Sequence, residues 1–156
     1  AAKAGIVCGA YHYFKPSKSG SWQARFFLQN VKVEKGDLPM VVDVEELNHM
    51  TPDKMRLQLK EFVTFVEKKT HIKPIIYSGS SFYQDYLLGF FDDYPLWVAN
   101  YNLPEMKPVG SKQWLVWQHS DKAEVRGISG PVDSDRFNGS LEELVALSKV
   151  GTSDIE

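Results

Sequence analysis

The chain has 156 residues, of which 43% are hydrophobic and 13% aromatic, and this is enough apolar material for one packed core. We therefore expect a single domain over residues 1–156. Its 18 basic and 20 acidic side chains are spread along the chain without a basic cluster, so we expect no nucleic-acid partner. No apolar run approaches the ~20 residues that span a bilayer, so no membrane span is expected.

Short apolar runs alternate with helical patterns over the first two thirds of the chain, which favours βα units and a parallel sheet. After Trp97 the strands follow one another through loops without intervening helices. The predicted strands are Gly5–Tyr13, Pro39–Glu45, Lys73–Ser78, Pro95–Tyr101, Gln113–His119 and Val132–Phe137.

Four segments have helical patterns. The clearest begins with Thr51 as N-cap and Pro52 at the first helical position, and apolar residues then recur at helical spacing. The other predicted helices are Ser17–Val33, Ser80–Leu88 and Ser140–Val150. Their expected inward residues are Trp22, Phe26, Phe27 and Val33 in the first, and Leu141, Leu144, Val145 and Leu147 in the last.

The start of the chain looks incomplete. Residues Ala1–Ala4 resemble the end of a helix and lead directly into an apolar strand, with nothing before them to cover the strand's other edge. An uncovered edge invites aggregation. We therefore expect further N-terminal structure in the intact protein.

The stretch "MVVDVEE" ends an apolar strand in carboxylates. Because side chains alternate along a strand, Asp43 and Glu45 share one face, whereas Glu46 points elsewhere. The α-carbons of Asp43 and Glu45 are expected roughly 6.6 Å apart, at the carboxyl end of a parallel strand where ligands bind. Glycosidic-bond hydrolysis uses such a pair, with one acid protonated. Crowding of like charges is expected to help Glu45 hold its proton.

Two alternatives remain open for this pair. Asp43 can cap or pair locally while the two glutamates are solvated at a strand exit. The pair can also bind a metal, but the four histidines (His12, His49, His71 and His119) show no ligand spacing with it. We therefore expect no metal and no cofactor.

The late stretch "GPVDSDRFNG" adds further acids. Asp133 and Asp135 fall on one face of the last strand, and in a closed barrel Asp133 can face Asp43 and Glu45 across the mouth. The alternative is a turn built on Gly130 and Pro131.

Aromatic residues gather near the strand ends, where their rings can stack on the CH faces of sugars. Each ring taken singly is more often a core residue, but together they suggest a groove. They are Tyr11, Tyr13, Tyr77, Trp97, Tyr101, Trp114 and Trp117.

The motifs "GAYHYF", "MVVDVEE", "KPIIYSG", "YPLWVANY", "WLVWQHS" and "VDSDRFNG", in this order, resemble glycoside hydrolase family 25, the Chalaropsis-type lysozymes or N-acetylmuramidases. The resemblance implies an α/β fold, an irregular TIM-like (β/α)5(β)3 barrel, and cleavage of the β-1,4 bond between N-acetylmuramic acid and N-acetylglucosamine in peptidoglycan. It implies Glu45 as general acid, Asp43 as its partner and Asp133 as a late acidic residue. With Tyr13 from the aromatic grouping, the substrate-binding candidates are Tyr11, Tyr13, Tyr77, Trp97, Tyr101 and Gln118.

The chain departs from the family pattern by lacking the first strand, which carries an aspartate, and a second βα unit. We therefore predict an incomplete barrel of about six strands, an N-terminally truncated catalytic domain. The alternatives are a non-catalytic glycan-binding or inactive remnant of the fold, or a chitinase-like glycosidase. Inverting and substrate-assisted retaining mechanisms both stay open, as does the oligomeric state. A peptidoglycan substrate implies an exported, extracellular or periplasmic protein.

Overall fold

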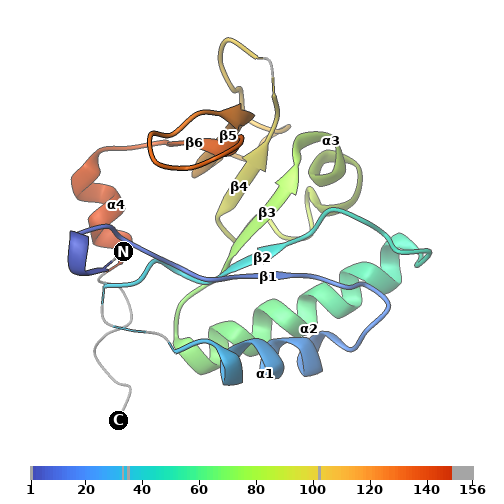
Figure 1. The fold of residues 1–156 in the computed structure, drawn as a ribbon. Helices are drawn as coiled ribbons and strands as arrows, with labels where there is room; N and C mark the ends of the chain where they lie inside the picture. Colours follow the sequence, from blue (N-terminus) through green and yellow to red (C-terminus); the bar gives the residue numbers. More distant parts are fainter. Residues whose placement is uncertain (1, 33, 35, 102, 149–156) are drawn as a thin grey trace.

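The computed structural model describes residues 2–32, 34, 36–101 and 103–148. Its centre is one six-stranded sheet in the order β1 to β6, curled into a half-barrel (Figure 1). Pairing is parallel from β1 through β5, and β6 is antiparallel to β5. The strands are β1 (Tyr11–Tyr13), β2 (Val41–Asp43), β3 (Ile75–Gly79), β4 (Leu96–Ala99), β5 (Val116–Ala123) and β6 (Val132–Phe137).

The predicted fold class, an incomplete α/β barrel with about six strands, is confirmed. All six predicted strands occur, but the first, second and fourth are clearly shorter than expected. In the first, only Tyr11–Tyr13 forms a ladder, although the Leu38 amide still donates to the Cys8 carbonyl at 2.7 Å. An apolar run indicates where the chain is extended. How much of that run forms a hydrogen-bonded ladder depends on the length of the neighbouring strand.

The helices are η1 (Ala2–Ala4), α1 (Gly20–Asn30), α2 (Pro52–Thr70), α3 (Ser80–Phe82) continued by the π-helical η2 (Tyr83–Leu87), and α4 (Leu141–Leu147). The predicted start of α2 is confirmed, since the Thr51 side chain accepts from the Lys54 amide and Pro52 is the first helical residue. The helix ends at His71, which adopts the left-handed conformation. None of the helices in the described ranges combines the length and apolar character needed to cross a membrane.

The core lies between the sheet and the helices. Val42 and Val44, which point away from the inside of the half-barrel, are fully buried, as are Met55, Leu59 and Phe62 of α2. Helices α1 and α2 lie side by side below β1 and β2 (Figure 1). The alternate residues of the strands are thereby left free to line the inner face of the curl.

Two predicted apolar faces are partly wrong. Trp22 and Phe26 of α1 are 60% and 48% exposed and stack on each other, with ring centroids 5.5 Å apart, whereas Phe27 is buried. Leu141 of α4 is 74% exposed. Position on a helix indicates which residues share a face, but not how far the neighbouring elements extend over it. Val33 and the end of the predicted last helix lie outside the described residues.

Candidate active site

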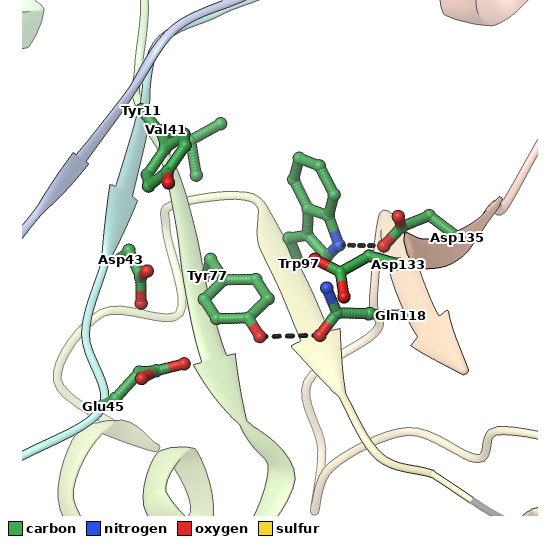
Figure 2. Close-up of a pocket in the computed structure, with 9 residues that line it drawn as sticks. All are labelled: Tyr11, Val41, Asp43, Glu45, Tyr77, Trp97, Gln118, Asp133 and Asp135. Atoms are coloured by element: carbon green, nitrogen blue, oxygen red, sulfur yellow. Dashed lines mark hydrogen bonds between the residues drawn. The ribbon is translucent and has the colours of Figure 1, made fainter. Parts of the chain in front are cut away.

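A cavity of about 320 Å³ lies on the inner face of the half-barrel. It is lined by Tyr11, Val41, Asp43, Glu45, Tyr77, Trp97, Gln118, Asp133 and Asp135. Strand register explains this set, because Asp43 lies opposite Tyr77, Tyr77 opposite Trp97, and residues opposite one another share a face. Figure 2 shows Asp43 and Glu45 on one wall, the Trp97 and Asp133 side chains on the other, and Tyr77 between them.

Asp43 is the last residue of β2 and is half-buried. Its burial, followed by the charge of Glu45, raises the pKa of this carboxyl from 3.8 to about 7. Its Oδ1 atom is buried and has no hydrogen-bond partner among the described residues. An orphaned carboxylate oxygen is costly for the fold, so it marks a place where a donor from a ligand would be accepted. The sequence predicts that crowding raises the pKa of one of the two carboxyls, and in the structure it is the half-buried Asp43 whose pKa is raised.

Glu45 follows β2 and is open to solvent at the cavity. The sequence prediction that it shares a face with Asp43 is confirmed by their common position in the cavity wall. Glu46 instead pairs with Lys15, with Nζ and Oε1 at 2.8 Å, and does not line the cavity. The alternation of strand side chains therefore continues past the end of the ladder.

The opposite wall carries a second pair of acids. Asp133 and Asp135 of β6 both line the cavity, and the Trp97 indole Nε1 donates to Asp135 Oδ1 at 2.8 Å. Partial burial raises the pKa of Asp135. The hydrogen bond from Trp97 lowers this pKa, and the nearby charge of Asp133 raises it further. Asp135 was not among the predicted site residues, although its place two residues after Asp133 was a signal for the same face.

Two tyrosines hold the side chain of Gln118. The hydroxyls of Tyr77 and Tyr101 both donate to Gln118 Oε1 at 2.7 Å. Burial raises the pKa of both phenols, so both remain donors at neutral pH. Tyr101 therefore supports the cavity through Gln118 without lining it.

The other predicted groove residues have mixed outcomes. Tyr11 and Trp97 line the cavity, whereas Tyr13 does not and has the Lys15 ammonium over its ring at 4.4 Å. Trp117 is 5% exposed and belongs to the core, and Trp114 packs against that core. The last two rings do not line the cavity: Trp117 lies opposite the buried Val98 in the β4–β5 register, and Trp114 precedes β5.

No group of three or more His, Cys, Asp and Glu side chains able to hold a metal ion occurs within the described part of the chain. The four cavity carboxylates are divided between two walls (Figure 2). This arrangement can act on a polar ligand held between the walls, with acids on both sides and flat aromatic rings between.

The family model that matches the chain is described as "Glycosyl hydrolases family 25" and covers residues 1–128. Among curated proteins, the chain is 49% identical over 143 residues to the uncharacterized protein YegX of Escherichia coli (strain K12), covering 92% of this chain and 52% of that protein. It is 32% identical over 162 residues to lysozyme M1 of Streptomyces globisporus, covering 95% of this chain and 55% of that protein. The chain thus spans about half the length of these relatives.

Among solved structures, the fold is similar to the crystal structure of the bacterial lysozyme from Streptomyces coelicolor. The TM-score is 0.83 and the sequence identity 30%, and the match covers 95% of this chain and 75% of that structure. The half-barrel therefore corresponds to most of the architecture found in that lysozyme.

Proposed function

The chain belongs to glycosyl hydrolases family 25, and we propose that it is a muramidase that hydrolyses the β-1,4 bond between N-acetylmuramic acid and N-acetylglucosamine in peptidoglycan. The observation that carries this proposal is the pair of carboxyls, Asp43 and Glu45, on one wall of a cavity whose other surfaces are aromatic and acidic. The similarity to a protein named lysozyme M1 supports the same substrate.

In the proposed reaction, Glu45 is the general acid. It stands at the cavity surface without an ion-pair partner among the described residues, and in the proposed role it protonates the glycosidic oxygen as the bond to C1 breaks. The Lys15 cation does not oppose this role, because it is engaged by Glu46. After the leaving group departs, the Glu45 carboxylate can accept a proton from the incoming water.

Asp43 is proposed to act on the sugar's 2-acetamido group. Its unpartnered Oδ1 can accept the acetamido N–H, while the acetamido carbonyl oxygen attacks C1 and forms a cyclic oxazolinium. A carboxylate beside that positive ring stabilises it, and water then opens it to give a retained product. This substrate-assisted route uses the orphaned oxygen of Asp43, whereas an inverting route would use the carboxylate as a base for water.

The remaining lining residues are proposed to bind the sugar. Trp97 and Tyr77 offer rings for stacking, with centroids 6.0 Å apart at an interplanar angle of 80°. The side-chain amide of Gln118 offers a hydrogen bond, and Asp133 faces the Asp43 wall from β6. Because peptidoglycan lies outside the cytoplasm, the protein is also proposed to be exported.

The test is Glu45→Gln, assayed by release of reducing sugar from bacterial cell walls, with mass spectrometry to identify muramic acid at the new reducing ends. We expect a loss of roughly 10²–10⁴-fold, the usual contribution of a general acid. Glu46→Gln is the matched control, since Glu46 lies outside the cavity, and it should retain activity within about twofold.

Equal release by Glu45→Gln and the unaltered protein would refute Glu45 as the acid. Tight glycan binding without any bond cleavage by the unaltered protein would favour the non-catalytic alternative. Proton NMR of the first product formed distinguishes the routes, because retention supports the acetamido mechanism and inversion contradicts it.

A further inference from the structure

We infer that Asp135 is a positioning residue, whose carboxylate holds the Trp97 indole in the orientation in which it forms a wall of the cavity. This inference rests on the proposed function, because the wall matters as a surface on which a sugar stacks. The sequence places Asp135 on the same strand face as Asp133 but assigns it no role in the site.

The contact that supports it crosses the sheet. Trp97 lies on β4 and Asp135 on β6, with β5 between them, and the indole Nε1 donates to Asp135 Oδ1 at 2.8 Å. The two residues are 38 positions apart in the chain, so only the curl of the sheet brings them together. This hydrogen bond, at the edge of the five-membered ring, restricts rotation of the indole about its side-chain torsions.

A second contact fixes the same ring from the other direction. The Tyr77 ring meets the Trp97 ring edge-on at 6.0 Å, and Tyr77 is itself held by its hydrogen bond to Gln118. Asp135 lies opposite Gln118 in the β5–β6 register. The indole is therefore held between Tyr77 and Asp135 while it lines the cavity (Figure 2).

The negative charge of Asp135 supports a role in holding the indole. A neutral acceptor at position 135 would receive the same indole N–H without adding a second carboxyl beside Asp133. The carboxylate forms the stronger, charge-assisted bond at the expense of that repulsion. A firmly held indole is useful where its face must meet a sugar ring in one orientation, since stacking depends on the angle between the two faces.

The test is a double-mutant cycle with binding and kinetics as separate readouts. Asp135→Leu removes the acceptor, Asp135→Asn keeps a carbonyl acceptor, and Trp97→Phe keeps a ring without the N–H. Binding is measured by calorimetry with the N-acetylglucosamine tetramer, and KM and kcat with solubilised peptidoglycan. Asp121→Asn, on an exposed side chain outside the cavity, is the control for loss of one negative charge.

We expect Asp135→Leu to weaken tetramer binding and raise KM about 5–20-fold, with kcat changed less than about threefold. Asp135→Asn should stay within about threefold of the unaltered protein, and Asp135→Leu should have no further effect in the Trp97→Phe background. Additive losses in the double variant would overturn the inference. A large kcat loss in Asp135→Asn would also overturn it, because the residue would then act directly through its charge.

One further measurement and one substitute variant keep the outcomes separate. Near-UV circular dichroism reports the rigidity of the indole, and if Asp135→Leu does not fold, Asp135→Ala, which also lacks a side-chain acceptor, takes its place in the cycle. Because tetramer binding needs no bond cleavage, a non-additive cycle in a protein that fails to cut peptidoglycan would uphold the role of Asp135 while refuting the proposed reaction.

Discussion

Asp43 and Glu45 are two residues apart on one face of the same segment, yet their surroundings differ. Asp43 is drawn into the wall at the end of β2, and Glu45 stands at its rim. Burial of an unpaired carboxyl opposes folding when the group is charged, so the Asp43 side chain in its charged form destabilises the folded protein. That cost has a measurable dependence on pH.

We predict that the unaltered protein loses stability as the pH rises from about 4 to about 7, and that Asp43→Asn removes this loss. The folded protein binds the Asp43 proton more tightly than the unfolded chain, since the pKa rises from 3.8 to about 7 on folding. The free energy of unfolding therefore falls as pH rises through this window, and at pH 8 the variant should be more stable by about 1–2 kcal/mol after allowance for partial solvent exposure.

Urea denaturation at pH 4 and pH 8 measures this difference. Asp93→Asn, on an exposed side chain, is the matched control and should change stability equally at both pH values. A pH dependence in Asp43→Asn identical to that of the unaltered protein would contradict the assignment.

We also predict that Tyr101→Phe weakens substrate binding although Tyr101 does not line the cavity. The lost hydroxyl is one of the two donors to Gln118 Oε1, so the amide becomes free to turn. KM for solubilised peptidoglycan should rise about 3–10-fold, with little change in kcat. An unchanged KM would show that Tyr77 alone orients Gln118.

At the scale of elements, the site depends on how α1 and α2 pack under the first two strands. Gly20 opens α1 at its contact with α2, and its amide donates to Gln58 Oε1 at 2.8 Å. Three residues later, the buried Gln23 accepts from the Lys15 amide at 2.8 Å and donates to the Lys15 carbonyl at 3.0 Å. The helix start thus anchors the loop whose Lys15 engages Glu46 beside the site.

We predict that Gly20→Ala destabilises the protein by about 2 kcal/mol or more. A Cβ at this position would overlap the Gln58 carbonyl oxygen and lie 2.7 Å from the carbonyl carbon, so backbone must move. Gly79→Ala is the control, since a Cβ there has no atom within 4 Å. Urea denaturation should separate the two variants, and equal midpoints would contradict the close packing of α1 on α2.

At the scale of the whole molecule, the described residues form an open curl rather than a closed barrel. β3 and β4 are flanked by strands on both sides, while β1 and β6 each have one partner within the described sheet. Tyr11 of β1 is 69% exposed, whereas Leu96 and Val98 of β4 are fully buried. Stability should therefore decrease from the middle of the sheet toward its edges.

We predict that amide hydrogen exchange in this chain, followed by mass spectrometry, is slowest in β3, β4 and α2. Peptides covering β1 and β6 should exchange at least about tenfold faster, because their edge amides open without unfolding the core. Protection of β1 equal to that of β3 would show that its free edge is covered, by association or otherwise.

Much of the fold could be predicted from local pattern. All six strands were located, and Thr51 and Pro52 marked the start of α2, because capping and periodicity are properties of a few neighbouring residues. The same reasoning overestimated burial of Trp22, Phe26 and Leu141. Their exposure depends on how far other elements reach, which no local pattern specifies.

For the candidate site, the sequence by itself determined which residues share a face: Asp43 with Glu45, and Asp133 with Asp135. Only the tertiary structure decided that an open curl already brings the two pairs to one cavity, that burial raises the pKa of Asp43, and that Asp135 binds the Trp97 indole. Alternation along a strand follows from backbone geometry, which adjacent residues carry with them. Desolvation and contacts between β4 and β6 arise only when the sheet curls, since they depend on residues far apart in the chain.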